Sequence, residues 1–150
     1  SHELDYMLWL FGQVKTVFAR LTPGLILGID VEEEAELEFV TEFGIPISMH
    51  LDFVSKDRSR QCIVKGENGV LTLDLTASTI TVITGNDNET VEMLFPVEMD
   101  KVYEAQMTHF FQCIEENLDP LAGVKEGLMV LQLVEKLRLS NERVRWIANN

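Results

Sequence analysis

The pattern that most constrains this chain is an alternation of apolar and acidic side chains between Asp30 and Phe43. The apolar positions are Val31, Ala35, Leu37, Phe39 and Phe43, and the acidic positions are Glu32, Glu34, Glu36, Glu38 and Glu42. Successive side chains of a strand point to opposite faces of a sheet. The segment therefore predicts a strand with one packed face and one face that is either solvated or in contact with a basic partner.

Other segments show the same strand character. The following run places Ile47, Met49, Leu51 and Phe53 on one face and Ser48, His50 and Asp52 on the other. A further strand is expected over Val14–Leu21. Asn68-Gly69 lies between two strand-like runs and predicts a hairpin, and residues 79–95 predict a second hairpin with a polar loop. One-sided strands of this kind are typical of an antiparallel sheet.

Three helices complete the pattern. The first is predicted over His2–Phe11 with Gly12 as its C-cap, and it is so apolar that burial on more than one side is expected. The second is predicted from an N-cap at Asp100 to about Leu118, and the third from about Val124 to Ser140. Helices at the two ends of a block of strands predict an α+β fold, with a sheet covered by helices on one face.

Composition limits the possible partners. The 150 residues suit a single domain, and they carry a formal net charge of −13 from 12 basic and 25 acidic side chains. This charge argues against binding nucleic acid or an anionic membrane, because both need a cationic surface. No apolar run approaches the roughly 20 residues that span a bilayer. Cys62 and Cys113 form no CxxC pair, and we expect two free thiols in the reducing cytoplasm.

His2 and Asp5 are the candidate catalytic pair. They lie three residues apart, so they share one face of the predicted first helix. A carboxylate there can orient an imidazole that acts as a general base. The alternative is an ordinary helix start, where acidic residues are favoured by the helix dipole. The histidines His2, His50 and His109 have no metal-ligand spacing, so we expect no metal site.

A basic loop is the second candidate. Lys56, Arg58 and Arg60 lie between two predicted strands, where they can reach an anionic sugar or phosphate group, or simply remain solvated. The chain has neither GxGxxG nor GxxxxGK, so we expect no cofactor-binding residue within it.

Three segments together resemble a known family. They are SHELDYMLWLFGQVKTV, CIVKGENGVLTLD and HFFQCIEENLDPLAGVKEGLMVLQLVEKLRLSNE. In this order they resemble the C-terminal domain of the Gfo/Idh/MocA oxidoreductases, the family of glucose–fructose oxidoreductase and inositol dehydrogenase. The resemblance runs nearly from end to end. It implies a large, open, mostly antiparallel sheet, similar to the C-terminal domains of dihydrodipicolinate reductase and glyceraldehyde-3-phosphate dehydrogenase.

The resemblance also implies roles for residues and partners. His2 would take the proton from a sugar or polyol hydroxyl while hydride passes to NAD or NADP, and Asp5 would support it. An aspartate four positions before His2, and a Rossmann domain with a lysine, would precede Ser1. We therefore expect residues 1–150 to be a substrate-binding and dimerisation domain, inactive alone and without bound cofactor. Its partners would be the Rossmann domain, a sugar-like substrate and a second copy contacting its sheet.

An alternative interpretation assigns the chain no catalytic activity. The chain would then be a free-standing binding or assembly module that dimerises through its sheet, since it contains no complete catalytic set.

Overall fold

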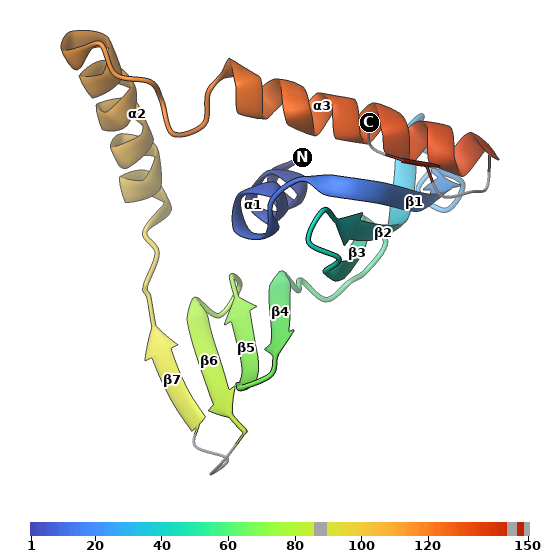
Figure 1. The fold of residues 1–150 in the computed structure, drawn as a ribbon, viewed down its shortest axis with the longest axis horizontal. Helices are drawn as coiled ribbons and strands as arrows, with labels where there is room; N and C mark the ends of the chain where they lie inside the picture. The colour runs from blue at the N-terminus through green and yellow to red at the C-terminus, as the bar shows by residue number, and fades with distance from the viewer. Residues whose placement is uncertain (86–89, 144–146, 149–150) are drawn as a thin grey trace. The chain divides into compact units, whose positions relative to one another are not determined.

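The computed structural model describes residues 1–85, 90–143 and 147–148. In chain order the elements are α1 (His2–Phe11), β1 (Val14–Pro23), β2 (Glu32–Thr41), β3 (Pro46–Asp52), β4 (Gln61–Gly66), β5 (Gly69–Asp74), β6 (Thr79–Thr84), β7 (Thr90–Leu94), α2 (Met99–Glu116), α3 (Val124–Arg143) and β8 (Ile147–Ala148) (Figure 1). The chain forms two compact units. The first unit is Ser1–Ser55 with Leu121–Asn150, and the second unit is Lys56–Pro120.

The predicted α+β class is confirmed, with the strands divided between two antiparallel sheets. In the first unit the strand order is β3-β2-β1-β8, and in the second unit it is β4-β5-β6-β7. Between β3 and β4 the chain leaves strand geometry over residues 53–60, a segment rich in charge with the sequence FVSKDRSR. Helices α1 and α3 belong to the first unit and α2 to the second.

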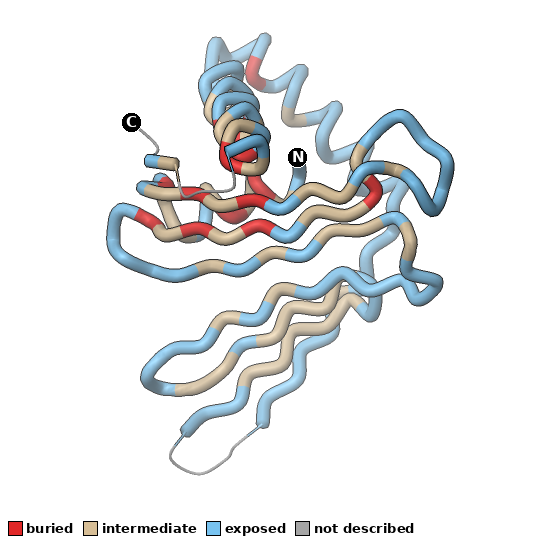
Figure 2. Tube along the Cα trace, turned by 90° about the vertical axis from the view of Figure 1, so that its right-hand side faces the viewer, coloured by how far each residue is buried: buried red, intermediate tan, exposed pale blue. Residues whose placement is uncertain are grey.

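The core of the first unit lies between one face of its sheet and the helices α1 and α3. Figure 2 shows the buried residues concentrated there. The buried apolar side chains are Leu4, Met7, Val14, Val17, Ala19, Leu37, Phe39, Val130, Leu133 and Leu137. The alternation predicted for the second strand holds at Leu37 and Phe39. Val31 and Phe43 are exposed instead, because they lie beyond the ends of β2.

Side chains of α3 also satisfy the outer edge of β1. Among the described residues, β8 pairs with β1 at Thr16 and Val17, and no strand is paired with the later N–H groups of that edge. The backbone N–H of Ala19 donates to Ser140 Oγ at 3.2 Å, and that of Leu21 donates to Asn141 Oδ1 at 2.8 Å. Buried backbone donors need such partners. These bonds therefore fix the C-terminal half of α3 along the sheet edge.

Glu33 breaks the alternation on which the strand prediction rests. It falls on the apolar face of β2 and is only 1% exposed. Its carboxylate accepts hydrogen bonds from the backbone N–H groups of Ile26 and Leu27, with Oε2 at 3.0 Å from each nitrogen. These bonds compensate the burial of the charge and hold the apolar β1–β2 loop in place.

The helix predictions need three corrections. The bounds of α1 agree with the prediction, but Trp9 is 82% exposed and Leu10 is also exposed, so α1 is not buried all round within the described residues. The predicted N-cap role of Asp100 is wrong, because the N-cap of α2 is Glu98 and Asp100 lies in the first turn. The helix ends at Glu116, two residues before Leu118, with Asn117 in the left-handed conformation at the C-cap.

The first predicted hairpin is present with its turn shifted by one residue. Gly66 pairs with Gly69, so Glu67 and Asn68 form the loop and Gly69 begins β5. In the second hairpin the predicted polar loop falls partly on residues 86–89, which lie outside the described residues. Across the described ranges, no helix has both the length and the apolar character to cross a membrane.

Buried Glu33 gives a test of this fold. Glu33→Ala leaves two backbone donors of the loop without their acceptor, so we expect the free energy of unfolding to fall by about 2–3 kcal/mol. Glu38→Ala is the matched control, because Glu38 lies on the opposite face of β2 and accepts only an exposed bond from Ser48 Oγ. We expect it to change stability by less than about 0.5 kcal/mol in the same urea titration. Equal losses for both variants would contradict the role assigned to Glu33.

Candidate functional site

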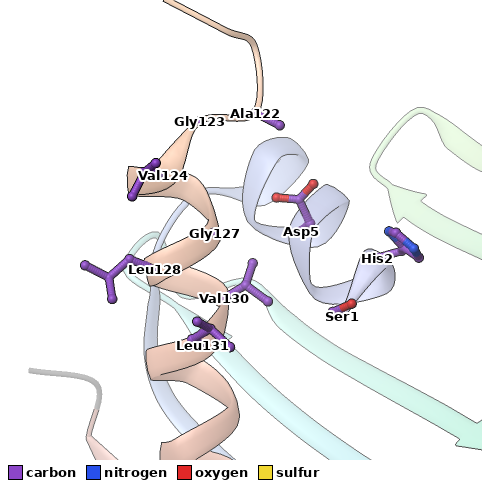
Figure 3. Close-up of a pocket in the computed structure, with 10 residues that line it drawn as sticks. All are labelled: Ser1, His2, Asp5, Ala122, Gly123, Val124, Gly127, Leu128, Val130 and Leu131. Carbon is purple, nitrogen blue, oxygen red and sulfur yellow. The ribbon is translucent and has the colours of Figure 1, made fainter. Parts of the chain in front are cut away.

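A hollow of about 560 Å³ lies in the first unit, where the start of α1 meets the first turns of α3. It is lined by Ser1, His2, Asp5, Ala122, Gly123, Val124, Gly127, Leu128, Val130 and Leu131 (Figure 3). Its wall is mainly apolar, and His2 and Asp5 are the ionisable side chains that line it. A concave apolar surface with a few polar groups is the usual form of a small-molecule site.

His2 and Asp5 both line this hollow. Within the described residues, however, their side chains make no hydrogen bond to each other. Figure 3 shows the Asp5 carboxylate directed to the side of α3, whereas the imidazole of His2 turns the other way. The orienting role of Asp5 and the catalytic role of His2 therefore stay predictions.

The first turns of α3 form the opposite wall. The N–H of Gly123 donates to the Glu126 side chain at 2.9 Å, which closes the start of the helix. A Cβ built on Gly127 would meet no atom within 4 Å, so this glycine opens onto free space. Sequence reasoning did not single out these glycines. Gly127 could have been noticed because it lies inside a helical pattern, where glycine lowers helix stability by about 1 kcal/mol relative to alanine.

The described residues do not fit NAD or NADP. A dinucleotide site of the usual kind needs a strand, a glycine-rich turn and a helix within a parallel βαβ unit. Both sheets here are antiparallel, and the chain reaches α3 from a loop that follows α2. No reaction step through a nicotinamide can be built from these residues.

The basic loop lies in a different unit from the hollow. Lys56, Arg58 and Arg60 are all exposed in the connection between β3 and β4, at the start of the second unit. The carbonyl of Arg60 accepts the N–H of Leu75 at 2.9 Å, which ties the end of this loop to the end of β5. Their contribution to a substrate site stays a prediction.

A second polar cluster lies on the open face of the first sheet. Cross-strand pairing sets His50 opposite Glu36, with Nδ1 2.8 Å from a Glu36 oxygen and Nε2 3.1 Å from an Asp52 oxygen. The hydrogen bond to Glu36, assisted by Asp52, raises the pKa of His50. The pKa of Asp52 is lowered, chiefly by the backbone N–H of Ser55.

This cluster also brings ligand-type atoms together. One such atom each of Glu34, Glu36 and His50 lie within 4.8 Å of one another. The spacing along the chain gave no sign of the group, because it is formed by register between two strands. We interpret it as an ion-pair network, since both ring nitrogens of His50 already have carboxylate partners.

Comparison with known proteins covers almost the whole chain. The family model for the Gfo/Idh/MocA type, described as the oxidoreductase family C-terminal alpha/beta domain, matches residues 1–148. A search of curated protein sequences gives no match.

Solved structures share the fold at low sequence identity. An aldose-aldose oxidoreductase from Caulobacter crescentus, complexed with glycerol, is 17% identical with a TM-score of 0.83, and the match covers 98% of this chain and 45% of that one. An NAD binding oxidoreductase from Klebsiella pneumoniae is 14% identical (TM-score 0.84; 98% and 48% covered). A levoglucosan dehydrogenase in complex with NADH and levoglucosan is 17% identical (TM-score 0.85; 98% and 48%). The chain thus spans a little under half the length of these structures.

A glycine substitution tests the open space at the wall. Gly127→Ala adds a methyl group in open space within a helix, so we expect the free energy of unfolding to rise by about 0.5–1 kcal/mol. Gly24→Ala, in the β1–β2 loop, is the contrasting variant, because its Cβ would clash with the carbonyl oxygen of Ile29. We expect it to lose about 1–3 kcal/mol. Chemical denaturation measures both, and a destabilising Gly127→Ala would show that this space is filled.

The His50 network gives a pH-dependent test. We expect NMR titration to find the pKa of His50 above its ordinary value, and Glu36→Gln to lower it, with exposed Glu42→Gln as the control. A raised pKa in the folded state means that the stabilisation is complete below the ordinary histidine pKa and is lost as the pH rises through the raised value. The effect on stability is small because the imidazole is 49% exposed. An unshifted pKa would contradict the cross-strand contacts.

Proposed function

Because this chain belongs to the Gfo/Idh/MocA oxidoreductase family as its C-terminal alpha/beta domain, we propose that it is the substrate-binding and oligomerisation half of an NAD(P)-dependent dehydrogenase. The substrate would be a sugar, a polyol or a nucleotide-linked sugar, oxidised or formed at a hydroxyl carbon. The observation that carries this proposal is the hollow that His2 and Asp5 line between two helices of a domain with this fold.

The cofactor half would be an N-terminal Rossmann domain outside residues 1–150, which act together as one domain of the parent protein. This is supported by the share of the solved structures that the chain spans, 45–48% for the three compared. It also accounts for exposed apolar side chains of α1 and around the start of α3, including Trp9, Leu121 and Val124. A packed second domain would remove such side chains from water.

His2 would act as the general base of the reaction. Oxidation of a secondary alcohol removes the hydroxyl proton and a hydride from the same carbon; His2 would take the proton at a ring nitrogen. NAD or NADP supplies the hydride acceptor when bound by the other half. Asp5 would position the substrate from the same wall, since its carboxylate is directed to the side of α3 (Figure 3).

The substrate class is proposed from the neighbours and from the basic loop. The names of two neighbours contain a sugar substrate or class, aldose and levoglucosan, and all the neighbours compared are below 25% identity. The basic residues Lys56, Arg58 and Arg60 would suit the phosphates of a nucleotide-linked sugar. The free thiols of Cys62 and Cys113 support a reducing, cytoplasmic location.

The test of this proposal is His2→Ala in the full-length parent enzyme. We expect turnover to fall by about 10²- to 10⁴-fold, because a general base typically contributes that much. His50→Asn is the matched control, since His50 lies on the open face of the sheet away from the hollow, and we expect turnover close to the unsubstituted enzyme. Circular dichroism of both variants of the 150-residue chain should match the parent chain.

Two further observations decide between this proposal and a module without chemistry. The gene should encode roughly 150 more residues upstream, with a strand, GxGxxG and a helix at their start. The 150-residue chain alone should neither bind NADH in calorimetry nor turn over substrate. Unchanged turnover of His2→Ala would remove His2 from the mechanism, and an upstream sequence without the dinucleotide fingerprint would contradict the dehydrogenase assignment.

A further inference from the structure

Four polar side chains lie next to one another on the open face of the first sheet. Strand register sets Glu34 opposite Asp52 and Glu36 opposite His50, and the two residues from each strand are two positions apart, so all four share one face. We call them the open-face cluster. One ligand-type atom each of Glu34, Glu36 and His50 lie within 4.8 Å of one another. Imidazole nitrogen and carboxylate oxygen are both ligands that Zn²⁺ accepts in proteins.

The two ring nitrogens of His50 have different surroundings. Nδ1 lies 2.8 Å from Oε1 of Glu36, and Nε2 lies 3.1 Å from Oδ2 of Asp52. A metal-binding histidine usually donates the N–H of one ring nitrogen to a carboxylate, which leaves the lone pair of the other nitrogen for the ion. Asp52 is suited to accept this N–H, because its side chain is only 15% exposed and is held by the backbone N–H and the hydroxyl of Ser55.

Glu34 is also held from outside the cluster. The hydroxyl of Thr22 donates to Oε2 of Glu34 at 3.0 Å, which orients this carboxylate. Arg20 lies opposite Glu36 on β1, but the described residues contain no ion pair between the two. The carboxylates of the cluster therefore have His50 as their cationic partner in this part of the chain.

We propose that Glu34, Glu36 and Nδ1 of His50 bind a divalent transition-metal ion, with Zn²⁺ as the ion that these ligands favour, and that Asp52 positions the imidazole. The ion would take the place of the hydrogen between His50 and Glu36, so the ion-pair network described above is the metal-free form of the same cluster. A water molecule would complete four-fold coordination. The inference departs from the expectation of no metal site, which considered only spacing along the chain, and it does not rest on the proposed function.

The distances require only small side-chain movements. Zinc binds nitrogen and oxygen at about 2.0–2.2 Å, so two ligand atoms of a tetrahedral site lie about 3.4 Å apart. The contact between Nδ1 and Glu36 would widen slightly, and the longer separations within the cluster would shorten. Both changes need only side-chain rotation, because His50 and Glu36 are each 49% exposed.

The imidazole decides which ions fit. Mg²⁺ and Ca²⁺ prefer oxygen ligands, whereas Zn²⁺ binds imidazole and carboxylate together. An acidic surface alone would attract all divalent cations alike, and this chain carries a formal net charge of −13. A preference for Zn²⁺ that depends on His50 therefore distinguishes a specific site from general attraction by charge.

The test is calorimetric titration of the 150-residue chain with zinc chloride at about pH 8, because ligation needs the unprotonated imidazole. We expect one Zn²⁺ per chain and no measurable binding of Mg²⁺. His50→Asn should abolish zinc binding, and Asp52→Ala should raise the dissociation constant about 10- to 100-fold, as for other outer partners of a ligating histidine. Glu38→Gln is the matched control, because it removes the same charge from the same face of β2, next to Ser48. We expect it to change the dissociation constant by less than about 3-fold.

A second control addresses the thiol. The Sγ of Cys113 lies 3.5 Å from Nε2 of His109 in α2, so this pair could also attract zinc. Cys113→Ser should leave the binding unchanged. Nitrogen NMR of the unsubstituted chain gives a measurement that needs no variant: we expect the His50 proton on Nε2 and a shift of Nδ1 when zinc is added. Circular dichroism checks the fold of each variant.

Four outcomes would overturn the inference. They are the absence of zinc binding, equal binding of Mg²⁺, zinc binding that survives His50→Asn, and zinc binding that is lost with Cys113→Ser. A zinc-dependent shift at Nε2 instead of Nδ1 would contradict the positioning role of Asp52. All these measurements are made without turnover and away from the hollow, so this inference and the proposed function fail separately.

Discussion

The contact between α3 and β1 is the interaction on which the first unit depends. Val130, Leu133 and Leu137 bury the apolar stripe of the helix on the sheet. The side chains of Ser140 and Asn141 then bond to the backbone of β1 along its edge. The apolar contacts favour close approach without fixing a register, whereas the hydrogen bonds allow only one position along the strand. With its C-terminal half fixed, the straight helix carries its glycine-containing first turns to α1, and the hollow exists because these two helix starts meet.

The two sheets differ in how far their strand residues are buried. In the first unit the apolar face is covered by α1 and α3, and the face left open is polar and joined by ion pairs such as that between Glu36 and His50. In the second unit no residue of the four strands is buried. Nearly all the buried apolar side chains of the described residues therefore belong to the first unit.

The sequence predicts those features that depend on local periodicity. The alternation of apolar and polar residues located β2 and β3. The apolar run that ends at Gly12 located α1. Features formed between distant segments were not predictable in this way. Glu33 looked like one more glutamate of an acidic strand, and only the loop folded over it shows why a carboxylate is buried there. The His50 cluster depends on register, and the separation into two sheets depends on where pairing stops after β3. For the site, His2 and Asp5 are close in sequence and both line the hollow, whereas the facing Gly127 belongs to a helix more than a hundred residues later.

The three histidines differ in what surrounds them. Both ring nitrogens of His50 contact carboxylates, and its pKa is raised by Glu36 on a face of the sheet away from the hollow. His109 lies in α2 with its ring 3.5 Å from the Sγ of Cys113, in the other unit. His2 lines the hollow, and its side chain has no hydrogen-bond partner among the described residues. A general base needs a ring nitrogen that can reach the substrate hydroxyl. An imidazole already held by two carboxylates would have to give up one of those bonds first, so the general-base role proposed above falls to His2 and not to His50.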